Sequence, residues 1–80
     1  MNVSIPIINM SRTGENIRTL RLARGLTVRD LQQALGFGTP QAIYKWQQGV
    51  TLPTLDNLVI LSDILGVSME AILAVDSRRM

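Results

Sequence analysis

Residues 25–49 read GLTVRDLQQALGFGTPQAIYKWQQG, and this stretch predicts two short helices joined by a tight turn. Thr27 can cap the first helix, and Asp30, three residues later, completes a capping-box pattern. The apolar stripe of this helix consists of Val28, Leu31 and Leu35. Gly36 then supplies the left-handed residue at which helices commonly end.

The second helix of the stretch follows a turn rich in glycine. Thr39 can cap it, and Pro40 suits its first position, where a missing N–H costs nothing. Ile43 and Trp46 are three residues apart and therefore share one face of the helix. We expect Trp46 to be a core anchor for this reason, and Gly49 to end the helix.

The same order of cap, apolar stripe and glycine occurs on both sides of this stretch. The other predicted caps are Thr13, Thr54 and Ser68, and the other predicted terminators are Gly25 and Gly66. Five helices therefore account for the chain between residues 13 and 75. Agreement among these local signals favours an all-α fold.

The segment before the first predicted helix has a different pattern. In residues 1–12, apolar and polar side chains alternate with the period of a strand, but Pro6 would confine any strand to a sheet edge. A flexible arm is favoured over a strand. The predicted organisation is an N-terminal arm at 1–12, a helical domain at 13–75 and a tail at 76–80.

Composition argues against several classes of protein. The 80 residues include no cysteine and no histidine, and the six carboxylates form no tight cluster. The commonest general base and the commonest metal ligands are therefore missing, and we expect no enzyme, no catalytic residue, no metal site and no cofactor. No apolar run approaches the roughly 18 residues of a membrane span, and the start lacks the basic residues of a signal peptide. These features favour a cytoplasmic protein without membrane contact.

Charge is unevenly distributed along the chain. Residues 12–45 hold six basic and two acidic side chains, a net charge of +4, whereas residues 46–77 hold four acidic and no basic ones, a net charge of −4. Such a molecule can turn its positive part toward a polyanion. Chance could produce the same division among so few charges, so the pattern has weight only together with a motif.

Two short helices joined by a tight turn with glycine form a helix-turn-helix unit. A wider resemblance is carried by Ile17, Leu20, Arg21, Gly25, Leu26, Thr27, Leu31, Leu35, Gly36, Ile43, Trp46, Gly49, Pro53, Leu58, Leu61, Leu65, Gly66, Val67, Ser68 and Ile72. On these residues, the segment from Ile17 to Leu73 resembles the phage repressor and Cro family of DNA-binding proteins, also called XRE-like. The resemblance implies a five-helix, lambda-repressor-like domain that binds double-stranded operator DNA, with residues 39–48 as the DNA-reading helix.

The resemblance, together with the polar face opposite Ile43 and Trp46, indicates which side chains contact DNA. The expected base-reading residues are Gln41, Ala42, Tyr44 and Lys45. Glutamine can pair with adenine and lysine can donate to guanine, whereas Ala42 and Tyr44 can contact a thymine methyl group. The expected contacts to the DNA backbone are Arg24, Thr27, Arg29, Thr39, Gln48, Gly49 and Thr51, with Arg12 or Arg18 as further candidates. The alternative is an ordinary solvated helix face.

The sequence departs from the family pattern at several positions. Gln32 replaces a small residue usual in the first helix of the motif, and the turn after it is one residue longer than usual. Gln47 stands where a glutamate often pairs with Arg21, so a hydrogen bond to a neutral partner is expected instead of an ion pair. Val50 and Thr51 stand where the family usually has lysine or arginine, which predicts weaker, less salt-dependent DNA binding.

Apolar residues on the predicted fourth helix suggest a homodimer. Ile60 and Ile64 lie opposite Leu58, and with Val67, Val75 and the arm they exceed what one small core needs. The alternative is that Ile5 and Ile7 fold back over Ile60 and Ile64 within one chain.

The leading interpretation is a dimeric transcriptional repressor that binds an inverted repeat. A protein-interaction module, such as the antitoxin partner of a toxin, is the alternative.

Overall fold

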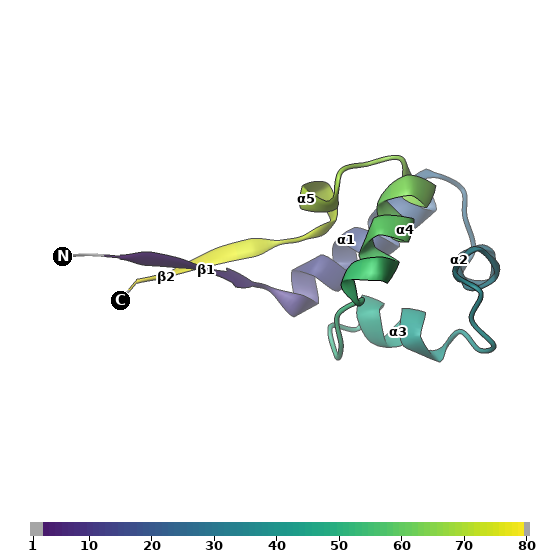
Figure 1. The fold of residues 1–80 in the computed structure, drawn as a ribbon, viewed down its shortest axis with the longest axis horizontal. Helices are drawn as coiled ribbons and strands as arrows, with labels where there is room; N and C mark the ends of the chain where they lie inside the picture. The colour runs from purple at the N-terminus through teal and green to yellow at the C-terminus, as the bar shows by residue number, and fades with distance from the viewer. Residues whose placement is uncertain (1–2, 80) are drawn as a thin grey trace.

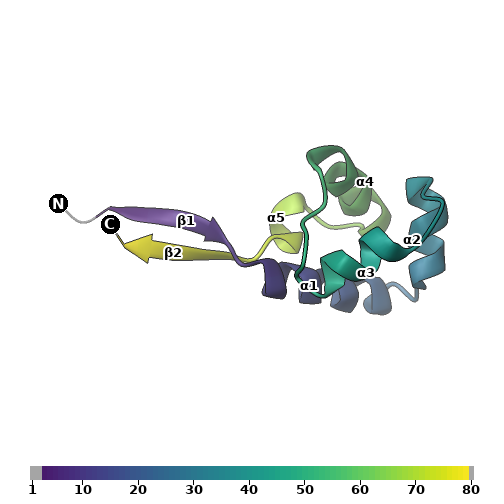
Figure 2. The same cartoon turned by 90° about the horizontal axis from the view of Figure 1, so that it is seen from below.

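The computed structural model describes residues 3–79 as a body of five helices from which a two-stranded antiparallel ribbon extends (Figure 1). The elements in chain order are β1 (Ser4–Ile8), α1 (Met10–Ala23), α2 (Val28–Leu35), α3 (Gln41–Gln47), α4 (Leu55–Leu65), α5 (Met69–Ile72) and β2 (Val75–Arg79). The molecule measures 48 × 22 × 20 Å, and the ribbon extends along the longest axis (Figure 2). The five predicted helices are confirmed, whereas the all-α class needs correction because of the small sheet.

A single hydrophobic core holds the helices together. It consists of Ile17, Leu31, Ile43, Trp46, Leu58, Leu61, Leu65 and Ile72, so every helix contributes to it. The side chain of Trp46 is 4% exposed, which confirms its predicted role as a core anchor. Phe37, in the turn between α2 and α3, meets the indole edge-to-face with ring centroids 5.7 Å apart. The turn is thereby joined to the core.

Three of the predicted helix caps are confirmed. Thr27 and Asp30 form both hydrogen bonds of the capping box, at 2.8 and 3.0 Å. The side chains of Thr54 and Ser68 accept hydrogen bonds from the first turns of α4 and α5. These local signals place the helices because each uses groups only a few residues apart.

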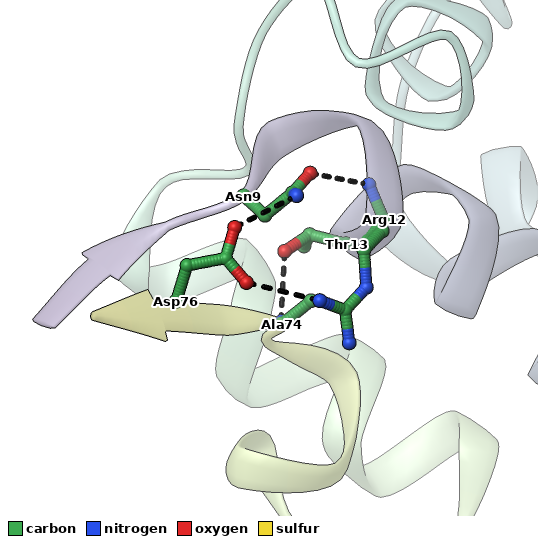
Figure 3. Close-up of polar contacts among 5 residues, drawn as sticks. All are labelled: Asn9, Arg12, Thr13, Ala74 and Asp76. Atoms are coloured by element: carbon green, nitrogen blue, oxygen red, sulfur yellow. Dashed lines mark hydrogen bonds and ion pairs between the residues drawn. The ribbon is translucent and has the colours of Figure 1, made fainter. Parts of the chain in front are cut away.

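The predicted cap at Thr13 is wrong, because α1 begins one turn earlier. Asn9 caps this helix by accepting a hydrogen bond from the N–H of Arg12 at 2.9 Å. Thr13 lies inside the helix and is 1% exposed, and its hydroxyl accepts a hydrogen bond from the N–H of Ala74 at 2.9 Å. The threonine therefore joins the two ends of the chain instead of starting a helix (Figure 3).

The predicted cap at Thr39 is also wrong. In the structure α3 begins at Gln41, and the residue at its N-cap position is Pro40, which has no side chain able to cap. Thr39 is exposed in the preceding turn. The first backbone hydrogen bond of α3 runs from the N–H of Tyr44 to the carbonyl of Pro40 at 3.2 Å, and Ile43 and Trp46 pack the helix on the core.

Residues 4–8 form a strand where a flexible arm was expected, and residues 75–79, which include most of the predicted tail at 76–80, form its partner. Ser4 lies opposite Arg79 and Ile8 opposite Val75. The arm prediction failed because the pairing joins segments about 70 residues apart, which no local pattern reveals. Residues 1, 2 and 80 lie outside the described range, and the proposed division at residues 12 and 75 stays a prediction.

The base of the ribbon is fixed to α1 by a small polar cluster (Figure 3). The N–H of Asn9 donates to the carbonyl of Ala74 at 2.8 Å, and its side-chain amide donates to the carboxylate of Asp76 at 3.0 Å. The Arg12 guanidinium donates to the other oxygen of that carboxylate at 3.0 Å.

The ribbon extends away from α4 in both views (Figures 1 and 2). Its strand β1 includes Ile5 and Ile7, which pair with Arg78 and Asp76 of β2. The predicted alternative, in which these two isoleucines fold back over α4, is therefore wrong.

Candidate nucleic-acid interface

The position of α3 is set by its close contact with α1. Gly14 of α1 is buried, and a Cβ atom at this position would lie 2.8 Å from the carbonyl oxygen of Gln47 and closer still to that of Trp46. Only glycine allows the two backbones to approach this closely. Gly14 has no recognisable signal in the sequence, because its importance follows from how the helices cross and not from any local pattern.

The outward face of α3 carries a row of exposed polar side chains. Its members are Gln41, Tyr44, Lys45 and Gln48, all exposed and spaced so that they share one side of the helix. Tyr44 is 47% exposed. Ala42, which was predicted to read bases, is half-buried and packs against the core instead of joining this row.

A shallow hollow of about 280 Å³ lies between α2 and α3. Its lining consists of Val28, Arg29, Gln32, Gln33, Pro40 and Tyr44. The structure thus brings the predicted contact residues Arg29 and Tyr44 together, and it adds Gln33, which was missed. Gln33 follows Arg29 by four residues, so helical spacing alone would have placed the two on one face.

The long turn before α3 is held by Gln32. Its side-chain amide donates to the carbonyl of Phe37 at 3.3 Å. The glutamine at this unusual position therefore bonds to the longer turn that accompanies it. Together with the contact between Phe37 and Trp46, this bond fixes the approach of the chain to α3.

The end of α3 is held by Arg21. Its Nε donates to Oε1 of Gln47 at 3.0 Å, which confirms the predicted pairing with a neutral partner. Its Nη1 donates to the carbonyl of Leu26 at 2.9 Å. One half-buried guanidinium thus joins α1, the connection to α2 and the end of α3.

The loop after α3 uses its backbone amides internally. The N–H groups of Gly49 and Val50 donate to the carbonyls of Trp46 and Lys45 at 3.0 and 2.9 Å, and that of Thr51 donates to Lys45 at 3.4 Å. Gly49 has a φ of +75°. These amides complete the end of α3, so the exposed side chain of Thr51 is the group left to meet a ligand.

Two other predicted contacts lie apart from the exposed row of α3. The guanidinium of Arg24 lies beside Gly66, where α4 ends. A Cβ atom built at Gly66 would be 2.7 Å from Nη1 of this arginine. Thr27 is committed to the capping box, in which its hydroxyl accepts a hydrogen bond from the N–H of Asp30. The N–H of Thr27 donates to the Asp30 carboxylate at 2.8 Å, and this bond, with a smaller contribution from the Thr27 side chain, holds the pKa of that carboxyl below its ordinary value.

Within residues 3–79, no group of three or more acidic, cysteine or histidine side chains is arranged to hold a metal ion. No helix in the same range is both long enough and apolar enough to cross a membrane.

Comparison with known proteins agrees with this architecture. A helix-turn-helix family model matches residues 17–72. The chain therefore belongs to the XRE-type helix-turn-helix family of DNA-binding transcription regulators. A search of curated proteins gave no match.

Solved structures share the fold at low sequence identity. The restriction-modification controller protein C.AhdI from Aeromonas hydrophila has a TM-score of 0.70 and 22% identity over 79% of this chain and 94% of its own. The DNA-binding domain of BldD has a TM-score of 0.68 and 21% identity over 81% of this chain and 93% of its own. At such identities the likeness establishes the fold alone.

HppE, solved with Fe(II) and substrate, also shares the fold, with a TM-score of 0.73 and 24% identity over 82% of this chain. The similarity covers only 38% of the HppE chain. It therefore concerns one part of that protein and carries none of its chemistry to this one.

Proposed function

We propose that the chain is a sequence-specific double-stranded DNA-binding protein that acts as a dimeric transcriptional repressor. The observation that carries the proposal is the division of α3, in which Ile43 and Trp46 are buried while a continuous polar row faces outward. A helix of this kind fits the major groove, whose base edges differ in their donors and acceptors. A buried face fixed by Gly14 and Arg21 keeps the outward face in one orientation.

Base recognition is assigned to the N-terminal and central part of α3. Gln41 has both an amide donor and an acceptor, which match the N6 and N7 positions of adenine. Lys45 donates to the acceptors of guanine, and Tyr44 contacts a thymine methyl group or a phosphate. Ala42 is left with a supporting role, because it packs on the core.

Contacts to the DNA backbone are assigned to groups around this row. Arg29 lies with Tyr44 on the hollow between α2 and α3 and is suited to a phosphate. Gln48 and the exposed side chains of Thr39 and Thr51 extend the contact at either end of α3. Arg24 is not included, because its guanidinium lies beside Gly66.

A repressor with these contacts blocks other proteins from the operator by occupying it. Two copies related by a two-fold axis would read the two halves of an inverted repeat about 34 Å apart. Exposed apolar side chains support association, since Leu55, Val59 and Val75 are 79%, 55% and 52% exposed. Ile64 and Val67, which were predicted to add to this surface, pack against the core.

The proposal is tested by gel-shift titration of duplex DNA with the wild-type chain and with Gln41→Ala and Lys45→Ala. Both variants should lose affinity for a selected site, by roughly tenfold each, because one good base contact contributes about 1–3 kcal/mol of discrimination. Affinity unchanged by both substitutions would refute the assignment and favour the alternative, a module that binds a partner protein.

The proposed contact between Arg29 and a DNA phosphate is tested by comparing two arginine variants. Arg29→Ala should weaken binding to all sequences and reduce the slope of log K against log salt by about one, as expected for loss of one phosphate contact. Arg24→Ala removes the same charge from the α1–α2 connection and should leave the slope unchanged. Equal effects of the two variants would show that net charge, and not position, accounts for binding.

A further inference from the structure

The ribbon has two outer edges, and the pairing register shows which groups each presents. The N–H of Asn9 donates to the carbonyl of Ala74 at the base of the ribbon. Hydrogen-bonded and non-hydrogen-bonded residue pairs alternate along two antiparallel strands. The N–H and C=O groups of residues 75, 77 and 79 therefore point away from β1, and those of residues 4, 6 and 8 point away from β2.

The two edges differ in their ability to accept another strand. Pro6 lies in the middle of the outer edge of β1 and has no N–H to donate. On the outer edge of β2, Val75, Ser77 and Arg79 all have both groups. All five residues of β2 are exposed, and no third strand or helix lies along the ribbon within residues 3–79 (Figures 1 and 2). An open, unprotected strand edge is a template for pairing with another chain.

We propose that the outer edge of β2 pairs with β2 of a second copy of this chain, giving a four-stranded antiparallel sheet with its two-fold axis at Ser77. A two-stranded ribbon is marginally stable in water, whereas additional strands stabilise it. Pairing would also cover an exposed apolar side chain on this edge, since Val75 is 52% exposed. The contact is isologous, as a closed dimer requires.

The charges of β2 select the register. A two-fold axis at Ser77 pairs all five residues of β2, whereas an axis at Asp76 or Arg78 pairs only three of them. An axis at Asp76 would place two carboxylates opposite each other, and an axis at Arg78 would place two guanidinium groups opposite each other. An axis at Ser77 instead sets Asp76 opposite Arg78 of the second copy, twice by symmetry. Opposite charges across strands stabilise a pair and like charges destabilise it, so the Ser77 register is preferred.

The bond between Asp76 and Arg12 is compatible with this arrangement. The Asp76 side chain is 50% exposed, and an ionised carboxylate accepts more hydrogen bonds than the two it receives from Asn9 and Arg12. The intramolecular bonds fix the carboxylate at the base of the ribbon, and Arg78 of the second copy approaches its free side.

The inference rests on the dimer of the proposed function but not on its DNA contacts, and it is tested without DNA. The chain has no cysteine, so any disulfide between two copies must form at the one position where a cysteine is introduced. Ser77→Cys should form a disulfide-linked dimer under mild oxidation roughly tenfold faster, or more, than Ser4→Cys, because only the first pair of sulfurs is held together. Ser4 is the matched control, since it is an exposed serine on the edge of β1 interrupted by Pro6.

A charge reversal tests the register in sedimentation experiments. Arg78→Asp should raise the Kd of the dimer by about tenfold, because two attractive pairs become repulsive. Arg79→Asp makes the same charge change opposite Val75 and should have a clearly smaller effect. Equal cross-linking of the two cysteine variants, a monomer at high concentration, or equal effects of the two charge reversals would each overturn the inference.

These outcomes separate the inference from the proposed function. A chain that cross-links through Ser77→Cys but binds no specific DNA would support the ribbon dimer and refute the repressor. A chain that binds an operator through α3 but dimerises elsewhere, for example on α4, would support DNA recognition and refute the ribbon contact.

Discussion

Replacing Gly14 by alanine should destabilise the protein, although alanine is the better helix former. The new Cβ atom would lie 2.8 Å from the carbonyl oxygen of Gln47 and closer to that of Trp46. Close carbon–oxygen contacts between backbones are ordinarily about 3.3–3.6 Å. The neighbouring atoms are backbone and cannot move aside by a rotamer change, so α1 and α3 would have to separate.

The size of the effect follows from two opposing contributions. Alanine gains about 1 kcal/mol over glycine in a helix interior. Overpacking in a close-packed interior costs typically about 1–3 kcal/mol, occasionally more, and contact with two carbonyl groups places Gly14→Ala at the upper end. A net loss of roughly 1–2 kcal/mol should lower the Tm by roughly 5–15 °C for a domain of this size.

Thermal unfolding followed by circular dichroism measures this loss directly. Gly38→Ala is the control, because a Cβ atom there meets nothing within 4 Å and the residue does not have a positive φ. Its Tm should stay within about 3 °C of the wild type, as expected for an exposed site. A Gly14→Ala protein as stable as the wild type would refute the claim that this contact fixes α3.

Two further substitutions test the polar contacts of the helix-turn-helix. Gln47→Glu should raise the stability at neutral pH by about 1 kcal/mol, because a bond from the Arg21 guanidinium to a carboxylate is stronger than its present bond to a neutral amide. A lower Tm, or an equal gain from Gln33→Glu, would contradict this. The lowered pKa of Asp30 means that its carboxylate stabilises the fold above the unfolded pKa of about 3.9, and that this stabilisation disappears as the pH falls through the lower folded pKa. Asp30→Asn should therefore lower the urea midpoint at pH 7 and flatten the fall of that midpoint as the pH drops from the unfolded pKa of the carboxyl through its lower folded pKa. A pH dependence unchanged by the substitution would show that the Asp30 carboxyl does not contribute to acid unfolding.

The helices could be predicted because their signals are local. The capping box of Thr27 and Asp30, the inward pair of Ile43 and Trp46, and the cap at Thr54 all involve residues within a few positions of each other. The structure confirms each of them. The hydrogen bond between Arg21 and Gln47 was predicted only with the help of the family resemblance, since it spans 26 positions.

The failures concern groups whose partners are distant in sequence. Thr13 looks like a cap until Ala74 is known to donate to its hydroxyl. The strand at residues 4–8 depends on a partner at 75–79, and Gly14 matters only because α3 crosses α1 at that point. In each case the residue is visible in the sequence, but the group that it contacts is brought to it only by the fold.

The exposed row of α3 was predicted from the sequence, but fewer of the predicted contacts to the DNA backbone lie beside it in the structure. Lys45 and Gln41 lie where the helical period placed them. The amide of Thr51 was a reasonable candidate for phosphate, but closing the end of α3 takes up that donor. Arg24 and Arg29 are both exposed cations near the motif in sequence, and only the packing of Arg24 beside α4 distinguishes them.

Selection of bound sequences from random duplex DNA shows whether the exposed face of α3 reads bases. The wild-type chain should enrich a short inverted repeat. Gln41→Ala and Lys45→Ala should each lose the preference at one base pair per half-site and keep it elsewhere, since a side chain that reads a base determines only the position it contacts. Enrichment of the same sequence by all three proteins, or of no sequence by the wild type, would contradict the account.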